Sequence, residues 1–422
     1  MRVFKFGGAS VRDAAGVRNL LSIVRQQTDD LVVVVSAMGK TTNALERIVN
    51  SISNGDKTAV DQQWKELLAC HEQIAQDLGL NLREILVDDV FGAVLAHRNA
   101  ANLPYDELYD SVVSVGELMS TAIVAAFMNR EGVKTRLWYM PELLITDGTF
   151  REAVVNNQAS AQRMQHAWND PYRPRVVVTQ GFIGGTDSGH RTTLGREGSD
   201  YTAALVANYL DAENVTIWKD VPGILNADPR LEDHTVLIPE LSYNEAVELA
   251  YSGAQVIHPK TIRPLENKHI PLYVRPFGAP NQQGTTIKAA PTAPVCVPVY
   301  IWRKHQVLIT MRAKDFSFVL EDSLIRIFDV VRRCKLKVSL IQSSAVTVSV
   351  CVDESRTLPK AIQILGEYYN VTYNDNLELL TIRGTTPDII ESEQRGRNIL
   401  LSQLTRRTAK FVINTQSPTR SH

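Results

Sequence analysis

Apolar and amphipathic segments alternate through the first two-thirds of the chain. The run Leu31–Ser36 is apolar almost throughout, which is typical of a strand buried on both faces of a sheet. Apolar residues at positions 17, 20, 21 and 24 instead have the spacing of one helical face. The alternation predicts an α/β domain with a largely parallel sheet and right-handed crossovers. Similar patterns predict strands at Val3–Phe6, Thr135–Tyr139, Arg175–Gln180, Val215–Lys219 and Pro271–Phe277, and helices at Glu117–Arg130, Ser199–Leu210 and Tyr243–Ser252.

Two segments depart from this alternation. Residues 58–110 have helical patterns and no obvious strand, so we interpret them as a helical insertion or lid. Five prolines between Pro276 and Pro298 indicate a linker, which we place at residues 286–300. The α/β domain would therefore comprise residues 1–285.

The remaining residues, 301–422, follow another order. Strand, helix, strand, strand, helix and strand succeed one another, which is the order of a ferredoxin-like α+β unit, and about half of a second unit follows. The expected strands are Gln306–Arg312, Leu336–Ile341, Val346–Val352, Leu377–Arg383 and Ala409–Ile413, and the expected helices are Asp322–Cys334, Leu358–Tyr369 and Gln394–Thr405.

Composition narrows the possible partners. The 422 residues are 44% hydrophobic and carry a net charge of −1, which gives no electrostatic support for binding nucleic acid or an acidic membrane. No apolar run reaches the roughly 18 residues of a membrane span, and the N-terminus enters a strand without the apolar core of a signal peptide. Four scattered cysteines form no CxxC pair and have no metal-ligand spacing. We therefore expect a reduced, cytoplasmic protein without a metal site of its own.

Glycine-rich and polar clusters follow several predicted strands, where open α/β sheets bind their ligands. In Lys5–Val11, two glycines separate a strand from a helix. Glycines let backbone N–H groups approach an anion, and Lys5 adds a positive charge, so this loop has the layout of a phosphate cradle. A second cluster, Ser36–Asn43, contains a Gly-Lys-Thr triplet, but Val34 stands where a Walker A motif requires glycine.

A third cluster, residues 181–200, contains six glycines and allows two interpretations. It could be a long exposed hairpin, or an anion site in which Arg196 and Asp200 bracket a helix start capped by Ser199. A fourth cluster, Trp218–Arg230, alternates charges with Pro, Gly and Asn after a strand. Glu117 could by itself be no more than an acid favoured by a helix N-terminus.

Together these clusters favour phosphoryl transfer, in which positioning and charge neutralisation supply most of the catalysis. No Ser-His-Asp or Cys-His set has a recognisable spacing among the nine scattered histidines.

Five segments, in the same order along the chain, resemble the aspartate kinases, a family of the amino acid kinase superfamily with C-terminal ACT regulatory domains. The resemblance implies a three-layer α/β/α kinase domain with a mainly parallel sheet, followed by ferredoxin-like ACT units. It also implies that ATP phosphorylates the β-carboxylate of L-aspartate with Mg²⁺, giving 4-phospho-L-aspartate for lysine, threonine and methionine biosynthesis. The segments are Lys5–Val11 (KFGGASV), Gly116–Thr121 (GELMST), Thr192–Thr202 (TTLGREGSDYT), Asp220–Ile224 with Asp228–Arg230, and Gly253–Pro259.

The resemblance also assigns roles to individual residues. Lys5 would neutralise the transferred phosphoryl group, and Asp200 would organise the reacting groups. A carboxylate substrate is already ionised at neutral pH, so no strong general base is needed. Ser36, Thr42, Glu117, Arg196 and Ser199 would bind aspartate, and the nucleotide would contact Lys5, Gly7, Gly8, Ser10, Lys219, Asp220 and Arg230.

This chain departs from the family pattern at three site positions. Ala9 replaces a threonine of KFGGTSV, Glu197 replaces a glycine of LGRGGSD, and Gln255 replaces the lysine of a GAK triplet. We hypothesise that Lys219 or Lys260 supplies the cation missing at position 255.

The regulatory half departs as well. Ser339 and Ala345 stand where lysine-sensing ACT domains often carry acids, so we expect weak or no inhibition by lysine through that mode. The second ACT unit looks short. Pairing of ACT domains between subunits implies a homodimer, with an amino acid as the probable class of effector.

Two other functions remain open at this stage. The chain could be a kinase of another amino acid or of a nucleotide monophosphate, although those proteins usually lack GELMST and an ACT region. It could also be a catalytically weak amino-acid sensor, because Glu197 and Gln255 are unusual. Aspartate-dependent release of ADP would distinguish these possibilities.

Overall fold

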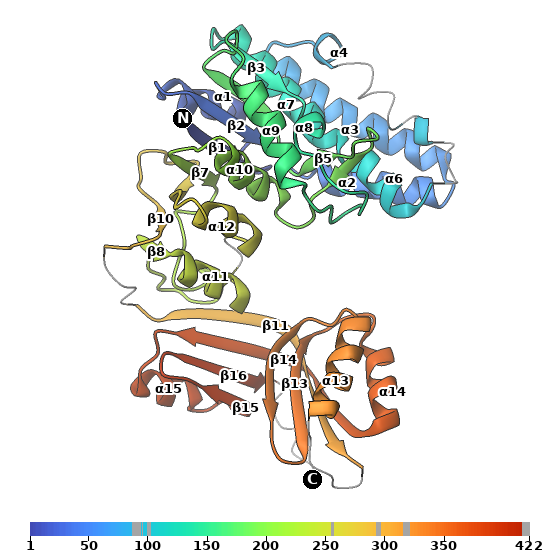
Figure 1. Ribbon diagram of the computed structural model, residues 1–422, viewed down its shortest axis with the longest axis vertical. Helices are drawn as coiled ribbons and strands as arrows, with labels where there is room; N and C mark the ends of the chain where they lie inside the picture. The colour runs from blue at the N-terminus through green and yellow to red at the C-terminus, as the bar shows by residue number, and fades with distance from the viewer. Residues whose placement is uncertain are drawn as a thin grey trace. The chain divides into compact units, whose positions relative to one another are not determined.

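The computed structural model describes residues 1–86, 94, 96–98, 103–254, 257–292, 297–314 and 321–415. They form two compact units (Figure 1). The first unit comprises residues 1–224, 237–250 and 255–294, and the second comprises 225–236, 251–254 and 295–422.

An eight-stranded sheet forms the centre of the first unit. All its neighbouring strands are parallel except the antiparallel pair β9–β10. β1 lies in the middle, between β2 and β7, which agrees with the apolar character of all three strands. The spatial order is β3 (Thr135–Trp138), β4 (Val176–Gln180), β2 (Leu31–Val35), β1 (Arg2–Phe6), β7 (Asn214–Lys219), β9 (Leu272–Pro276), β10 (Thr285–Lys288) and β8 (Glu240–Ser242).

The six strands expected in this domain are confirmed to within one or two residues. Four further strands were not expected: β8, β10 and the small hairpin β5 (Ile183–Gly185) and β6 (Arg191–Thr193). These strands are three or four residues long, and several of their positions are glycine or threonine. Such sequences lack a continuous apolar run. β10 also places regular structure inside the segment that we interpreted as a linker.

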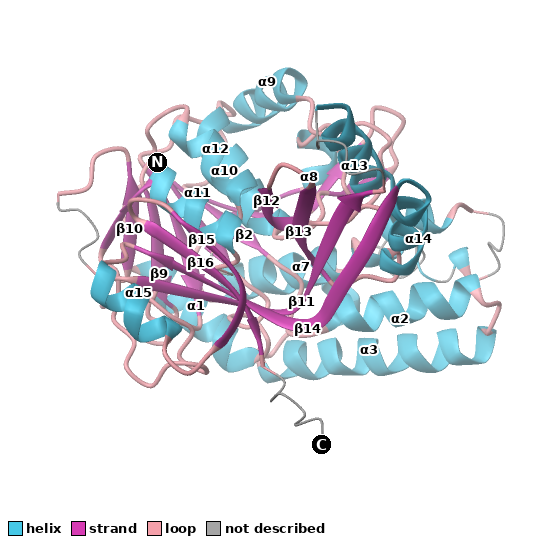
Figure 2. Ribbon diagram, turned by 90° about the horizontal axis from the view of Figure 1, so that it is seen from below, coloured by secondary structure: helices cyan, strands magenta, loops and turns pink. Residues whose placement is uncertain are grey.

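Helices cover both faces of the sheet (Figure 2). The face of the sheet that carries Phe6 and Gln180 is covered by α7 (Val115–Arg130) and α1 (Ala14–Arg25). Gln180 donates a hydrogen bond to the Thr121 hydroxyl of α7. The opposite face carries α10 (Gly198–Tyr209), with α9 (Asn157–Trp168) and α12 (Pro259–Glu266) packed against it. The expected three layers are therefore present. The other helices of this unit are α2 (Thr41–Ser53), α3 (Lys57–Asp77), α4 (Leu82–Ile85), α6 (Tyr105–Val113), α8 (Met140–Leu143) and α11 (Tyr243–Ser252).

The expected helical insertion corresponds to α3, α4 and α6, apart from positions outside the described residues. α6 and α7 follow one another across Ser114. Together, Tyr105–Arg130 are long and apolar enough to cross a membrane by length and composition alone. However, 83% of their most apolar window is buried inside the protein, as in the core helix of a globular domain. A lid function of this segment remains a prediction.

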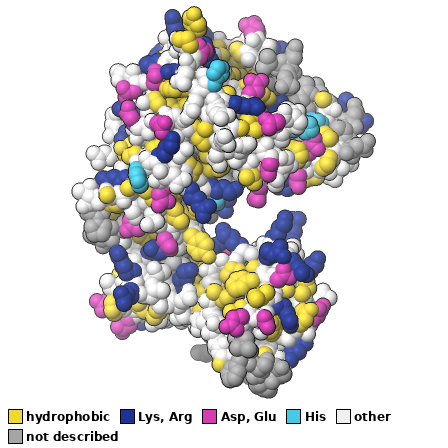
Figure 3. All heavy atoms as spheres, viewed as in Figure 1, with side chains coloured by type: hydrophobic (Ala, Val, Ile, Leu, Met, Phe, Trp, Pro, Cys, Tyr) yellow, Lys and Arg dark blue, Asp and Glu magenta, His cyan; other side chains and the backbone are white. Residues whose placement is uncertain are grey.

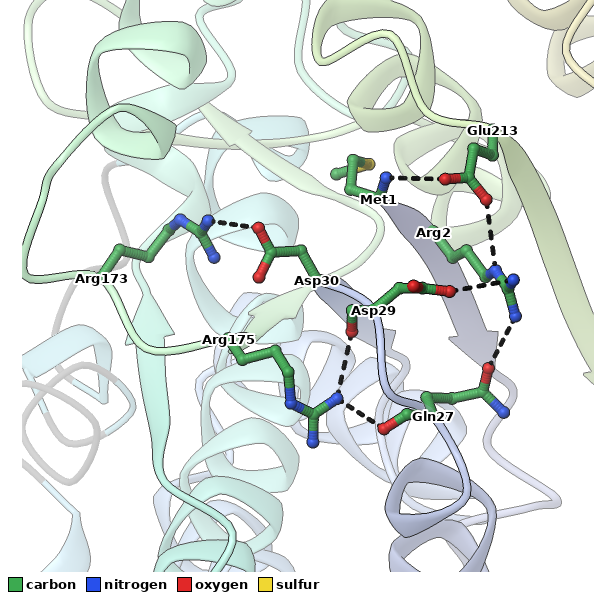
Figure 4. A network of polar contacts seen from close by, with 8 residues as sticks. All are labelled: Met1, Arg2, Gln27, Asp29, Asp30, Arg173, Arg175 and Glu213. Carbon is green, nitrogen blue, oxygen red and sulfur yellow. Dashed lines mark hydrogen bonds and ion pairs between the residues drawn. The ribbon is translucent and has the colours of Figure 1, made fainter.

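Charged side chains join the starts of the central strands (Figure 4). Arg2 of β1 pairs with Asp29 at 2.9 Å and with Glu213 at 3.5 Å, so it connects the segments that precede β2 and β7. Arg173, before β4, pairs with Asp30 at 2.8 Å. Exposed pairs of this kind add little stability individually, but the group aligns the strand starts. The opposite edge, where the strands end, carries the residues expected to bind ligands.

The second unit contains a six-stranded antiparallel sheet in the order β12-β13-β11-β14-β16-β15. Two of its strands, β11 (Val299–Ala313) and β14 (Tyr369–Arg383), are fifteen residues long and run through both halves of the sheet (Figure 2). The other elements are α13 (Glu321–Arg333), β12 (Val338–Ser343), β13 (Thr347–Asp353), α14 (Leu358–Tyr368), α15 (Pro387–Gln394), β15 (Asn398–Leu404) and β16 (Thr408–Asn414).

The first half of this sheet has the expected ferredoxin-like order, with α13 and α14 over one face. In the second half, the helix predicted at Gln394–Thr405 is wrong. Residues 398–404 form β15, where exposed and half-buried side chains alternate with the period of a strand, and the helix of this half is the earlier α15. The first five residues of β11 pair with the end of β14 and complete the half. The second ACT-like unit is therefore four-stranded but has one helix among the described residues.

Candidate functional site

The carboxyl ends of four parallel strands meet at one end of the eight-stranded sheet. Phe6 of β1 pairs with Val35 of β2 and with Trp218 of β7, and Val35 pairs with Gln180 of β4. Because these strand ends are in register, the loops that follow them emerge side by side. All four glycine-rich or polar clusters of the sequence begin at this edge.

Asp200 lies between two lysines at this edge. Its Oδ1 is 2.6 Å from Nζ of Lys5, and its Oδ2 is 3.5 Å from Nζ of Lys219. Lys5 and Asp200 are 8% and 2% exposed. Burial alone would raise the pKa of Asp200, but the two lysines outweigh this effect and lower it, so the carboxylate is ionised at neutral pH. The last residues of two strands and the first turn of α10 thus form one charged cluster.

The loops after β1 and β2 pack backbone against backbone. A Cβ atom on Gly8 would lie 2.6 Å from the carbonyl oxygen of Ala37, and the Gly39 N–H donates to the Gly8 carbonyl at 2.9 Å. Ser10 Oγ donates to the Trp218 carbonyl at 3.5 Å. Only glycine fits at position 8 without moving the facing loop, which explains the second glycine of the cradle.

Glu117 lies beneath this pair of loops, in the first turn of α7. Its Oε1 accepts a hydrogen bond from the Ala37 N–H at 3.1 Å, whereas its Oε2 is buried and has no hydrogen-bond partner among the described residues. Gly116 lets the helix approach, since a Cβ atom there would lie 3.0 Å from that of Ala37. Burial raises the pKa of Glu117 to about 8, although the Ala37 N–H and the charge of Lys5 lower it. Glu117 is therefore more than a surface acid at a helix start.

The third cluster forms the hairpin β5–β6 and the start of α10. The hairpin strands are largely buried, so only its tip matches the exposed-hairpin interpretation. Glu197, not Ser199, is the N-cap residue of α10, and it has a left-handed φ of 54° without a side-chain cap, so the predicted Ser199 cap is wrong. The chain turns into the helix one residue earlier than expected, at Gly198. Arg196 is exposed, and Ser199 is buried against Gly181.

The other expected site residues are less closely connected. Ser36 and Thr42 are half-buried at the start of the second loop and in the first turn of α2, and Asp220 is exposed after β7. Arg230 belongs to the second compact unit and pairs with Asp228 at 2.7 Å in its own turn. Gln255 lies outside the described residues, and Lys260 is exposed at the start of α12.

Sequence reasoning missed Asp110, a fully buried carboxylate of α6 that binds the hairpin strand β6. The available signal was an acid among the apolar residues of a helix. Nothing in the local pattern indicates its partner, which lies 83 residues further along the chain.

Known proteins with similar sequences place the chain in a family. A family model described as the amino acid kinase family matches residues 1–276. The lysine-sensitive aspartokinase 3 of Escherichia coli strain K12 is 32% identical over 353 residues, which cover 83% of this chain and 78% of that protein. The chloroplastic aspartokinase 1 of Arabidopsis thaliana is 31% identical over 84% of this chain, which spans 63% of that longer protein.

Solved structures agree. Aspartokinase III of E. coli in complex with aspartate and ADP superposes with a TM-score of 0.83 at 27% identity, covering 98% of this chain and 96% of that one. The same enzyme with lysine and aspartate gives a TM-score of 0.81. The aspartate kinase of Clostridium acetobutylicum, at 20% identity and a TM-score of 0.78, shares the fold.

A mostly parallel sheet with a lysine–aspartate–lysine cluster at its carboxyl edge, together with the match over residues 1–276, places this chain in the amino acid kinase family. Its regulatory-type second unit and its relatives narrow the assignment. The chain belongs to the aspartate kinases.

Proposed function

We propose that this aspartate kinase transfers the γ-phosphoryl group of ATP to the β-carboxylate of L-aspartate at the cluster formed by Lys5, Asp200 and Lys219. The observation that carries the proposal is a buried, ionised carboxylate held between one buried and one half-buried lysine. Phosphoryl transfer needs positive charge where negative charge gathers on the moving group, and little other protein chemistry. The acceptor is already a carboxylate anion, so the site needs no group to remove a proton.

The nucleotide phosphates would bind the loop Gly7–Ser10. Its close packing against the second loop supports this assignment, because glycines there leave backbone N–H groups accessible to an anion. Lys5 and Lys219 would face the transferred group and its neighbours, and Asp220 would contact the rest of the nucleotide. An ADP complex of the E. coli relative supports ATP as the donor.

Aspartate would bind between α7 and the start of α10. Glu117 suits the α-ammonium group, because a buried carboxylate oxygen without a partner gains most from a cation. Arg196 suits a substrate carboxylate, which a guanidinium binds with two parallel hydrogen bonds. Ser36 of the second loop, Thr42 of the first turn of α2 and Ser199 of the first turn of α10 would supply further hydrogen bonds.

Mg²⁺ would enter with the nucleotide. Within the described ranges, no three His, Cys, Asp or Glu side chains gather as a cluster that could hold a metal ion. Mg²⁺ in kinase sites is held by one or two carboxylates plus substrate phosphates, so the donor set here fits a nucleotide-borne ion. Asp200 and Asp220 are the carboxylates that could contact it, and the ion would supply further charge neutralisation.

The purified chain tests the function directly. With ATP, Mg²⁺ and hydroxylamine, it should form aspartyl hydroxamate and release ADP only when L-aspartate is added. Glutamate, acetylglutamate and nucleoside monophosphates should give no reaction. ADP release with one of these acceptors and not with aspartate would overturn the proposal, as would ATP binding with no turnover of any acceptor.

Lys219 should carry much of the affinity for ATP. Because it lies 3.5 Å from Asp200 at the end of β7, it can supply the cation that Gln255 lacks. We expect Lys219→Ala to raise the KM for ATP by about tenfold, the effect of one charge-assisted hydrogen bond, with a smaller effect on the KM for aspartate. Lys260→Ala, at an exposed position, is the comparison. Unchanged ATP KM values in both variants would exclude this compensation.

Regulation by lysine should be weak through the ACT site. Ser339 has a buried hydroxyl without a hydrogen-bond partner, and Ala345 is exposed in the turn before β13. Neither supplies the negative charge that an ε-ammonium group requires. Isothermal titration should therefore detect no tight lysine binding. Tight binding that is lost on changing Ser339 and Ala345 would contradict this expectation.

The proposal also includes the oligomeric state and the cellular compartment of the enzyme. The second unit exposes apolar side chains over α13, where Ile325 and Phe328 are 66% and 44% exposed (Figure 3). Such a surface supports a homodimer formed through the second unit. We also propose a cytoplasmic enzyme, and light scattering of the purified chain checks the dimer.

A further inference from the structure

The buried carboxylate of Asp110 joins three segments of the first unit. Its Oδ2 accepts hydrogen bonds from the N–H groups of Thr193 at 2.7 Å and of Arg151 at 2.9 Å. Its Oδ1 accepts from the hydroxyl of Thr193 at 2.7 Å. Asp110 is 0% exposed. One side chain of α6 thus fixes both the strand β6 and the loop before α9.

These segments lead to the two ends of the proposed aspartate site. Thr193 is three residues before Arg196, and Asp110 is seven residues before Glu117. The loop also supports the intervening turn, because a Cβ atom on Gly195 would lie 3.2 Å from the carbonyl oxygen of Arg151. Gly195 has a left-handed φ of 76°, so the turn before Arg196 is tightly defined by this contact. Asp110 is therefore close in sequence to Glu117, and its partner Thr193 is close in sequence to Arg196, the two residues that would bind aspartate.

The carboxylate is costly at this position. All three hydrogen-bond donors are uncharged groups, and burial raises the pKa of Asp110 although these donors lower it. Burying an ionised carboxylate without a directly paired cation reduces stability. An apolar residue would avoid this cost, but it would leave the N–H groups of Thr193 and Arg151 and the Thr193 hydroxyl without the acceptor that holds the two segments together. The bonding pattern therefore points to a geometric role.

We propose that Asp110 is a positioning residue that fixes the separation between Arg196 and Glu117 and thereby sets the affinity for aspartate. It touches neither substrate. The inference rests on the proposed function, since it assumes that Arg196 and Glu117 bind opposite ends of the amino acid. The hydrogen bonds of Asp110 go to Arg151 and Thr193 and not to the loops proposed to bind the nucleotide. We therefore expect its substitution to change the KM for aspartate and not the KM for ATP.

Asp110→Asn tests the proposal with almost no change in volume. The amide removes the negative charge that all three donors face, and its NH₂ group can be accommodated only opposite the Thr193 hydroxyl, which must then accept instead of donate. We expect the KM for aspartate to rise by about tenfold or more, the usual effect of a lost hydrogen bond to a charged group. The KM for ATP should stay within about twofold of wild type, and ADP titration should give an unchanged affinity.

Asp147→Asn is the matched control. Asp147 also accepts three hydrogen bonds, from the N–H and hydroxyl groups of Thr149 and from the N–H of Val154, but it is exposed and does not contact the hairpin. It should leave the KM for aspartate unchanged. An equal rise in both variants would overturn the proposal, because it would show a general effect of loosening this region.

Thr193 provides a second route if Asp110→Asn does not fold. Thr193→Val removes the hydroxyl and should raise the aspartate KM, whereas Thr193→Ser keeps it and should behave as wild type. A loss of kcat with an unchanged aspartate KM, or equal rises in the KM values for ATP and aspartate, would overturn the positioning role. A wild-type protein that forms no aspartyl hydroxamate would instead defeat the proposed function itself.

Discussion

Replacing Lys5 by methionine is expected to lower kcat by about 10²- to 10³-fold, the range observed when one preorganised group that stabilises transition-state charge is removed. Methionine keeps the length of the side chain and removes its charge from a position that is 8% exposed. Asp200 keeps Lys219 as a partner at 3.5 Å, so the buried carboxylate is not left without a cation. Steady-state kinetics with both substrates should show a loss mainly in kcat.

Lys268→Met is the matched control for this result. Lys268 forms a lysine–aspartate pair of similar length, 2.5 Å to Asp211, but on the surface at the end of α12. Breaking this exposed pair should change kcat by less than about twofold, since such pairs contribute little. If Lys5→Met keeps more than a tenth of the wild-type kcat while remaining folded by circular dichroism, Lys5 does not neutralise the transferred group.

At pH 9, where Glu117 is largely ionised, Glu117→Gln is expected to weaken aspartate binding by roughly 30-fold, about 2 kcal/mol for the loss of one partner of a buried charge pair. The amide can still accept the hydrogen bond from Ala37, so the loop geometry should be preserved. What is lost is the negative charge that would face the α-ammonium group of the substrate. The KM for ATP should change little.

The pH dependence of aspartate binding gives this prediction a second readout. The pKa of Glu117 is raised to about 8 in the free enzyme, so the carboxyl group is largely protonated at pH 6 and largely ionised at pH 9. An ammonium ligand prefers the ionised form. In the wild type, kcat/KM for aspartate should therefore rise with pH and level off above about 8. The Glu117→Gln variant should lack this rise. A parallel rise in both proteins would assign the titration to another group.

The sequence predicted the central strands because the apolar run of β2 and the shorter apolar runs of β1, β4 and β7 have few alternatives in an α/β domain. The same reasoning brought Lys5 and Asp200 together, since parallel strands end at a common edge. The short strands β8 (Glu240–Ser242) and β10 (Thr285–Lys288) were not predicted, because pairing with neighbouring strands, and not a local hydrophobic pattern, determines their conformation.

Other errors have a similar origin. The segment that became β15 contains apolar residues at positions 399–401 and 404, which fit a helical face as well as a strand, and the choice is made by pairing with β16. The predicted cap at Ser199 was wrong because the helix begins after Glu197. Glu197 has a left-handed backbone conformation, which is more common for glycine or asparagine and which the sequence therefore did not suggest. Asp110 depends on a contact between distant parts of the chain. Periodicity cannot reveal such contacts.

The nested order of strands in the second unit limits how this region can be exchanged between relatives. The fourth strand of the later half is supplied by the beginning of β11, ahead of the entire earlier half in the chain. The later half is therefore discontinuous in the chain, because the earlier half is inserted between its first strand and its other strands. A chimera that cuts between α14 and α15 would divide β14, separate it from Val299–Arg303, or separate both from β15 and β16, whereas a transfer of everything from β11 through β16 would carry each strand together with its neighbours.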